Sequence, residues 1–210
     1  MAANFNNSAW FYDRRSRLVY GRALIKSQLY LIQHIKPGSR ILIAGGGTGW
    51  ILDEITKLHP SGLHITYVEV AANMIALSQK RNTGANQMVY INNAIENVPL
   101  DYDFDTVLTP FLFDNFTEQT LKTVFNRIHT LLKPGGLWLN ADFQLTGKWW
   151  QQFLLKSMFV FFRIVCGIEA SKLPPIEIRF TQNGYKLVGQ ETFFNEFILA
   201  KIYSKINPGK

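Results

Sequence analysis

Cysteine is almost absent from this chain of 210 residues, and Cys166 is the only one. A single cysteine excludes an internal disulfide, a zinc site built from cysteines and a mechanism that needs two thiols. Its simplest role is that of a small buried apolar side chain. The four histidines do not have the spacing of metal ligands, so the sequence predicts no bound metal.

Long apolar runs and a secretory leader are also missing. No uninterrupted apolar stretch reaches the roughly eighteen residues that a spanning helix needs. Residues 1–8 show no basic segment followed by an apolar core, so we expect no signal peptide and a cytoplasmic location. A hydrophobic content of 47% argues against disorder and fits one globular domain over residues 1–210.

Charge is unevenly spread along the chain. Residues 1–40 carry seven Arg or Lys against one Asp, and residues 144–210 carry nine against four acidic residues. Between them, residues 41–143 carry six basic against ten acidic residues. The two basic flanks are compatible with an anionic substrate, an anionic membrane surface or RNA, and equally with an ordinary basic surface.

A glycine-rich turn is the most informative local pattern. Four apolar residues, Ile41 to Ala44, lead into a turn that contains Gly45, Gly47 and Gly49, and a helical pattern follows. A strand, a glycine turn and a helix bring backbone N–H groups close to a ligand in nucleotide-binding α/β proteins. A tight connection between strand and helix without a ligand is the alternative.

A second signal follows about twenty residues later, as the nucleotide-binding pattern requires. His64 to Val70 has the pattern of a strand, with Glu69 near its carboxyl end. An acidic residue in this place accepts hydrogen bonds from ribose hydroxyls. Alternatively, Glu69 is a favourable charge at the start of the next helix. The spacing from the glycine turn favours the ribose role.

Strand and helix patterns alternate over most of the chain, which predicts a parallel α/β fold. We expect a doubly wound, mostly parallel seven-stranded sheet, closed by an antiparallel C-terminal hairpin, with helices on both faces. The expected strands are 40–44, 64–69, 88–92, 105–109, 137–142, 185–194 and 197–204. The expected helices are 17–35, 49–58, 71–81, 118–132, 147–168 and 174–183.

From about residue 38 onward this order of motifs resembles the class I S-adenosylmethionine-dependent methyltransferases. The segments that carry the resemblance are the glycine loop 45–49, Glu69, Asn93–Ile95, Asp105–Pro110 and Leu132–Gly136. The last is among the more specific, since family members commonly read Leu-Lys-Pro-Gly-Gly before the fifth strand. The resemblance implies a Rossmann-like fold and S-adenosyl-L-methionine as the cofactor.

The resemblance also implies roles by position. The residues that it places at the cofactor are Ala44, Gly45, Gly46, Gly47, Gly49, Glu69, Val70, Asn93, Ala94, Ile95, Thr109 and Pro110. The glycines would pass under the methionine part and the ribose, and the acid would hold the ribose hydroxyls. Val70 and residues 93–95 would contact the adenine. Residues 109–110 would lie beside the methionine end and the methyl group.

Two positions depart from the family's pattern. Members often have an acidic residue two positions before the first glycine, where Ile43 stands here, and Asp is usual where Asn93 stands. Both changes remove a negative charge near a cationic ligand. They leave open a member that binds the cofactor weakly, or one that has lost its activity and serves as a binding or interaction protein.

Methyl transfer from a sulfonium is an in-line displacement, and orientation alone can supply about 7–11 kcal/mol of its barrier. A dedicated base is therefore not essential, although a hydroxyl acceptor benefits from one. Asp114, Asp142 and Tyr12 are the candidate catalytic residues, with Tyr20 as a further aromatic candidate. Their alternative roles are turn or capping aspartates and packing aromatics. In similar enzymes an N-terminal segment covers the site, which implies a helical lid over residues 1–36.

Residues 148–168 are apolar around most of a helix, interrupted by Lys156 and Arg163. Such a helix is covered by the protein's own core, an apolar substrate, a partner subunit or a membrane interface. Related enzymes insert substrate-binding elements here, so residues 144–175 are the expected substrate cap. The expected acceptor is a small hydrophobic, aromatic or lipid-like molecule, with an acid group as an option because of the basic flanks.

Nucleic acid is a weaker candidate substrate. Enzymes that methylate amino groups of nucleobases often carry Asn-Pro-Pro followed by an aromatic residue after the fourth strand, where this chain has Thr109 to Leu112. The leading prediction is methyl transfer to a small molecule. The alternatives are a non-catalytic cofactor-binding or interaction protein, an RNA methyltransferase and a nucleotide-dependent oxidoreductase. Peripheral membrane contact is a further candidate, and the oligomeric state stays open.

Overall fold

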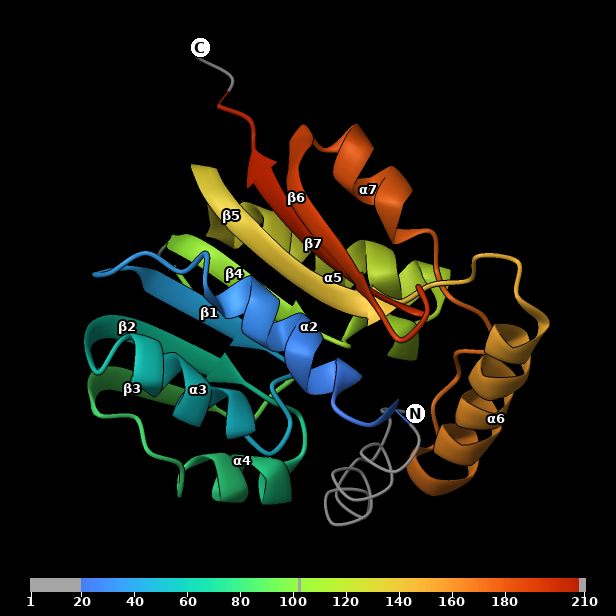
Figure 1. The fold of residues 1–210 in the computed structure, drawn as a ribbon. Coiled ribbons are helices and arrows are strands. Elements are labelled where there is room, and N and C mark those ends of the chain that lie inside the picture. Colours follow the sequence, from blue (N-terminus) through green and yellow to red (C-terminus); the bar gives the residue numbers. More distant parts are fainter. Residues whose placement is uncertain (1–19, 102, 208–210) are drawn as a thin grey trace.

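The computed structural model describes residues 20–101 and 103–207, which build one seven-stranded sheet with helices against both faces (Figure 1). The strands are β1 (Arg40–Ala44), β2 (Ser61–Val68), β3 (Ala85–Ile91), β4 (Phe104–Pro110), β5 (Leu132–Phe143), β6 (Tyr185–Phe193) and β7 (Ile198–Lys205). Their order in the sheet is β3-β2-β1-β4-β5-β7-β6. This confirms the predicted doubly wound sheet.

The five strands from β3 to β5 are parallel, and the order of the sheet reverses beside β1. β1 pairs with β2 on one side, with Ala44 opposite Val68, and with β4 on the other, with Ile43 opposite Leu108. The chain runs outward from β1 to β3 and then returns to β4. The connections therefore diverge above the carboxyl ends of β1 and β4, which is where ligands bind in this architecture.

The C-terminal hairpin is antiparallel, as expected. β7 lies between β5 and β6 and is antiparallel to both. The turn between β6 and β7 is tight, and Phe194, Asn195 and Glu196 all have positive φ angles between 50° and 68°. The hairpin fixes the end of β5, because Asp142 is paired with Leu199.

Helices cover both faces of the sheet. Those described are α2 (Ala23–Ile32), α3 (Trp50–Leu58), α4 (Ala72–Ser78), α5 (Glu118–Leu131), α6 (Trp149–Cys166) and α7 (Ile176–Gln182), with short 3₁₀ segments η2 (Ile95–Asn97) and η3 (Phe113–Asn115). α2 and α3 lie in front of the sheet in Figure 1, and α5 lies behind it. α6 stands apart from the sheet, beyond the carboxyl end of β5.

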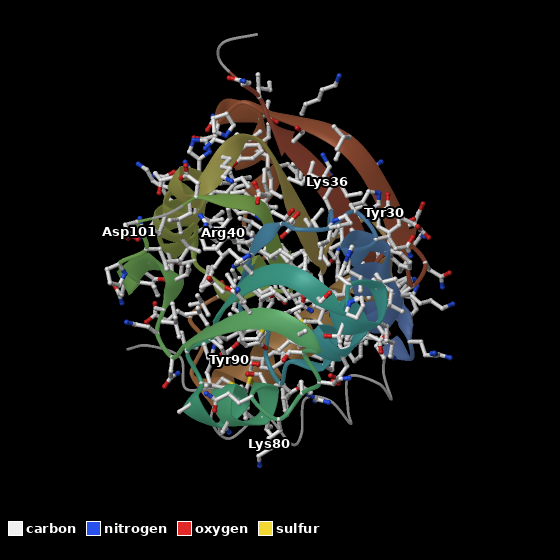
Figure 2. All side chains as sticks on the ribbon, turned by 90° about the vertical axis from the view of Figure 1, so that its left-hand side faces the viewer. Tyr30, Lys36, Arg40, Lys80, Tyr90 and Asp101 are labelled. Atoms are coloured by element: carbon white, nitrogen blue, oxygen red, sulfur yellow. The ribbon has the colours of Figure 1, made fainter. Side chains whose placement is uncertain are left out.

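The sheet separates two hydrophobic cores. One core joins α2, α3 and α6 to the near face of the sheet, and it includes Leu31, Ile51 and Phe159. The other joins α5 and α7 to the far face around Trp138, whose ring stacks on Phe125 at a centroid distance of 4.8 Å. The two cores thus cover the sheet on both sides, as parallel strands require. In the view from the β3 edge, the Lys80 side chain, which follows α4, points away from these cores (Figure 2).

Most element boundaries differ from the predictions by a few residues, and three differences matter. The helix expected over 17–35 is described only from Tyr20, and α2 begins at Ala23 after Gly21, whose φ is +57°. Residues 133–136, expected as a turn, belong to the long strand β5. Strand β2 ends at Val68, so Glu69 is the first residue of the loop that follows it.

Within the described part of the chain, no helix combines the length and the apolar character needed to cross a membrane. α6 is 18 residues long, but it contains Lys156 and Arg163. Residues 1–19 include most of the predicted N-terminal lid and lie outside the described residues, as does the candidate Tyr12.

Candidate functional site

A cavity of about 370 Å³ opens above the carboxyl ends of β1 and β4. The loops after β1, β2, β3 and β4 line it, together with α2 and the C-terminal end of α6. The cavity brings together ten of the predicted site residues, which are Gly45, Gly46, Gly47, Glu69, Val70, Asn93, Ala94, Ile95, Pro110 and Asp114. These residues come from four separate loops, and the fold places the four loops side by side.

Gly47 is held on both sides by side chains of β2 and its loop. Its N–H donates to Glu69 Oε2 at 3.1 Å, and its carbonyl accepts from the Tyr67 hydroxyl at 2.9 Å. Gly47 has a φ of +63°, and a Cβ atom there would meet only Met74 Sδ, at 4.0 Å. A side chain at this position would therefore extend into the cavity, which makes Gly47 a cradle for a ligand.

The other glycines of the loop are constrained by the protein itself. A Cβ atom on Gly46 would overlap the ring of Tyr67, and one on Gly49 would lie 2.5 Å from Ser78 Cβ. Gly49 precedes α3 as its N-cap and does not line the cavity. We expected Gly49 to lie under the cofactor. Its position does not match this expectation, because Gly49 lies against Ser78 of α4 at the start of α3.

Two supports of this loop could not be found from local sequence patterns. Tyr67 is fully buried in β2 and reaches the loop through its hydroxyl. Arg81, beyond α4, donates from Nε to the Thr48 carbonyl at 3.0 Å and pairs with Asp53 at 3.3 Å. Both act across the tertiary structure, where neither spacing nor composition gives a signal.

Glu69 lies in the half of the cavity that the loops after β1, β2 and β3 line. Its Oε1 accepts from the Ala71 N–H at 3.0 Å, while Oε2 accepts from Gly47. Burial raises the pKa of Glu69, and the backbone N–H groups of Ala71, Gly47 and Val70 oppose that rise. Each carboxylate oxygen can accept more than one hydrogen bond, so the side chain can also accept from hydroxyl groups in the cavity.

The adjacent loops complete this half of the cavity. Val70 is 46% exposed although it is apolar, and it lines the cavity. Asn92 Nδ2 donates to the carbonyls of Glu69 and Val70, both at 2.9 Å, which ties the loop after β2 to the loop after β3. Asn93 Oδ1 accepts from the Ala94 N–H at 2.8 Å, so part of its capacity is used within its own turn.

The opposite half of the cavity contains a carboxyl pair. Asp114 on η3 lines the cavity, and Asp142 at the end of β5 is buried beside it. Burial raises the pKa of Asp142 to about 7, and the backbone of Phe143, Phe113 and Asp114 limits the rise. The pKa of Asp114 is raised well above its usual value, first by burial and second by the charge of Asp142.

Comparison with known proteins agrees with this geometry. A family described as "Methyltransferase domain" matches residues 41–136, which run from β1 through the start of β5 and carry the glycine loop and Glu69. The chain is 31% identical over 145 residues to the ubiquinone/menaquinone biosynthesis C-methyltransferase UbiE of Wigglesworthia glossinidia brevipalpis, covering 66% of this chain and 57% of that protein.

These matches support a place among the class I S-adenosylmethionine-dependent methyltransferases.

Two further matches agree with this family. A malonyl-[acyl-carrier protein] O-methyltransferase of Bacillus cereus is 30% identical over 127 residues, which is 59% of this chain and 46% of that protein. The chain thus spans about half the length of the curated relatives that it matches. A Burkholderia thailandensis 1,6-didemethyltoxoflavin-N1-methyltransferase, solved with its substrate and S-adenosylhomocysteine, has a TM-score of 0.66 at 16% identity, covering 94% of this chain and 84% of that one.

Two further residues that the family pattern places at the cofactor lie elsewhere in this methyltransferase fold. Ala44 is fully buried at the end of β1, and Thr109 is fully buried in β4. The Thr109 hydroxyl donates to Asn140 Oδ1 at 2.8 Å and accepts from Trp138 Nε1 at 2.9 Å. The core therefore uses the Thr109 side chain, and neither residue lines the cavity.

The two departures from the family pattern have different settings. Ile43 is fully buried in the core on β1, so its side chain belongs to the packing of the sheet. Asn93 is exposed at the cavity. Within residues 20–101 and 103–207, no group of three or more His, Cys, Asp or Glu side chains is arranged to hold a metal ion.

Proposed function

We propose that the chain binds S-adenosyl-L-methionine in this cavity and transfers its methyl group by in-line displacement to a small, apolar or aromatic molecule. The observation that carries the proposal is the position of Gly47. Its backbone is held by Glu69 and Tyr67, and its missing side chain leaves room in the cavity. Bare main chain beside a buried carboxylate suits an adenosyl ligand.

The residues of the chain would bind the cofactor, orient it toward the acceptor and exclude water from the cavity. Gly45 to Gly47 would pass under the ligand, Glu69 would accept from the ribose hydroxyls, and Val70 would cover the adenine. When bound, the cofactor supplies a sulfonium methyl group that needs no further activation. Catalysis then depends on alignment, which can contribute about 7–11 kcal/mol.

Thermal unfolding with four ligands tests the proposal. A ligand at 100 times its dissociation constant adds about 2.7 kcal/mol to the native state, which a melting curve resolves. We expect stabilisation by S-adenosylmethionine and S-adenosylhomocysteine and none by NAD or NADP. Stabilisation by NAD alone would overturn the assignment of the cavity. Methyl transfer to a trial acceptor then separates turnover from binding.

An aromatic acceptor is favoured by the aromatic side chains of the cavity. The cavity is lined by Trp50, Phe111, Phe116 and Phe162. Aromatic side chains bury large areas and orient a flat ligand. The names of the two relatives point to acceptors of ubiquinone and menaquinone biosynthesis and to malonyl-[acyl-carrier protein]. We favour a ring-containing small molecule over nucleic acid, with the cytoplasm as the place of reaction.

The outer face of α6 supports peripheral contact with a membrane. Trp149, Phe153 and Ile164 are 80%, 66% and 79% exposed, and Val160 is exposed beside them. α6 has no acidic residue, and Lys156 lies on the same exposed side. A helix with aromatic, aliphatic and basic side chains facing outward suits an anionic lipid surface.

Sedimentation with vesicles tests this contact. We expect more of the protein to sediment with vesicles that contain phosphatidylserine than with phosphatidylcholine vesicles, and a Phe153→Ser, Ile164→Ser variant to lose the difference. Sedimentation with neither kind of vesicle would contradict a membrane role, and equal sedimentation with both would contradict the preference for anionic lipid. Concentration-dependent dimerisation that the same variant abolishes would instead assign the face to a second copy of the chain.

A non-catalytic cofactor-binding protein is the second candidate, and Ile43 is the residue that favours it. No carboxylate stands at this position, where the family's pattern often has one for the cofactor's amino group. Binding of S-adenosylhomocysteine without methyl transfer to any phenol, amine or acyl-carrier acceptor would favour this candidate. Turnover with any of them would exclude it.

A further inference from the structure

The ionisable side chains that line the cavity are all acidic. They are Glu69, Glu96, Asp114 and Glu169, and within the described residues no Lys, Arg or His lines the cavity. The chain as a whole carries a net charge of +7, so the cavity is opposite in sign to the molecule. An anionic acceptor would meet like charges in this lining. The acid group that the basic flanks suggested does not fit this lining.

Asp114 is one of these acids, and Asp142 is buried beside it without lining the cavity. Asp114 is 5% exposed, and its Oδ1 accepts from the Asn115 side chain at 2.7 Å. Asp142 is 7% exposed; its Oδ1 accepts from the Phe143 N–H at 3.0 Å, and its Oδ2 is buried without a hydrogen-bond partner. Two carboxyl groups in one low-dielectric site cannot both ionise at low cost.

We propose that Asp114 accepts the proton of an O–H or N–H group on the acceptor, that Asp142 is the positioning residue behind it, and that the cavity selects uncharged or cationic acceptors over anions. This inference rests on the proposed methyl transfer. As the bond from acceptor oxygen or nitrogen to the methyl carbon forms, the carbon–sulfur bond breaks and its electron pair stays on sulfur. The acceptor's proton passes to the Asp114 carboxylate.

The environment of the Asp114 and Asp142 pair predicts how the reaction rate depends on pH. The ionisable groups that act on Asp114 are Asp142 from β5 and Tyr20, which precedes α2 and packs on Phe143. All are anionic or neutral, so nothing among them favours ionisation of Asp114. Its protonated form therefore persists toward neutral pH, and the rate should rise as the pH increases through the ionisation of the pair.

Three phenols that differ mainly in charge test the selectivity. Tyramine is cationic, 4-ethylphenol is neutral and 4-hydroxyphenylacetate is anionic, and each is titrated into the protein saturated with S-adenosylhomocysteine. We expect the first two to bind at least about tenfold more tightly than the acid. Asp114→Asn should narrow the difference to about threefold or less, while Glu191→Gln, which removes an exposed carboxylate on β6, should leave it unchanged. Equal or tighter binding of 4-hydroxyphenylacetate would overturn the inference.

The pair is also tested without any acceptor. Carbon-13 NMR of aspartate-labelled protein should show one carboxyl that keeps its proton well above pH 5, and Asp142→Asn should lower the pKa of Asp114 by removing the neighbouring charge. With a turned-over acceptor, the same variant should move the rising limb of the pH–rate profile to lower pH. If both carboxyls titrate near their ordinary pKa values, the proposed interaction between Asp114 and Asp142 is wrong, whichever phenol binds.

Failure of this inference can be told from failure of the proposed function. If S-adenosylhomocysteine does not stabilise the protein, the methyltransferase assignment of the cavity fails, whatever the titration of the aspartates. If it does stabilise the protein but the anionic phenol is preferred, only the acceptor class is wrong. Should Asp114→Asn unfold, Asp142→Asn and the unmodified protein still decide the question by titration.

Discussion

The two halves of the cavity are built in different ways. The half that we assign to the cofactor (the cofactor half) consists mainly of backbone at the ends of β1, β2 and β3, and hydrogen bonds between neighbouring loops hold it in place. The half that we assign to the acceptor (the acceptor half) consists of side chains from α2, η3 and α6, with the buried pair of Asp114 and Asp142 in it. The first half follows from the fold, whereas the second depends on the particular residues that this chain places there.

Substitution of Gly47 should have the largest effect, and it tests the cofactor half separately from the acceptor half. Gly47→Val would place a branched side chain in the cofactor half, and we expect affinity for S-adenosylhomocysteine to fall by more than about 100-fold. Calorimetric titration measures this change. Gly38→Val is the matched control, because Gly38 has a φ of +74° and open space around it but does not line the cavity. Similar losses in both variants would mean that backbone strain alone is responsible.

Removal of the Glu69 carboxylate should have the next largest effect on this half. Glu69→Ala loses acceptors for the ribose and the bond to the Gly47 N–H, so we expect affinity for S-adenosylhomocysteine to fall about 10- to 100-fold. Glu54→Ala, which removes a half-buried carboxylate on α3 that pairs with Lys57 outside the cavity, is the control. An unchanged dissociation constant for Glu69→Ala would show that the carboxylate only supports the loop.

Stability against pH probes the acceptor half in the absence of any ligand. Because the folded protein raises the pKa of Asp142 from 3.8 to about 7, it binds this proton more tightly than the unfolded chain. The stabilisation is complete below about pH 4 and is lost as the pH rises to about 7. The loss is up to about 1.4 kcal/mol per pH unit within that window.

Denaturant unfolding from pH 4 to pH 8 measures this loss. Asp142→Asn should flatten the decline, since the amide does not ionise. The exposed variant Glu191→Gln should leave the decline as it is in the unmodified chain. Parallel curves for the unmodified chain and Asp142→Asn would show that Asp142 titrates normally.

The smallest expected effect concerns the link between β2 and the glycine loop. Tyr67→Phe removes one hydrogen bond to the Gly47 carbonyl and keeps the ring that packs on Gly46. We expect a loss of about 1 kcal/mol, or roughly fivefold in affinity for S-adenosylhomocysteine. Tyr90→Phe, whose hydroxyl bonds to the Ser78 carbonyl outside the cavity, should leave the affinity unchanged.

The sequence could predict most of the fold and much of the cofactor half, because these follow from short-range patterns. Apolar periodicity marks the strands, and the spacing from the glycine turn to Glu69 is fixed by one strand–helix–strand unit. The same reasoning did not show that Gly49 serves the contact with α4, or that Thr109 is used by Trp138 and Asn140 in the core.

The acceptor half was less predictable for a physical reason. Asp114 and Asp142 could each be named as candidates, but their burial in one site depends on how η3 folds back over the end of β5. The acidic character of the lining is equally invisible in the charge distribution, since the flanks of the chain are basic. The direction of a side chain at a loop end is set by tertiary packing, and sequence periodicity carries no information about that packing.

The pairing of β5 with β7 has a consequence for how this protein can vary. Asp142 and Phe143 lie opposite Leu199 and Ile198, so a distant C-terminal hairpin holds the backbone that carries the inner aspartate. Substitutions in that hairpin could change the acidity of Asp142 while leaving the loops after β1 and β2 untouched. Divergence among such enzymes in preferred acceptor could therefore arise from changes far from any bound molecule.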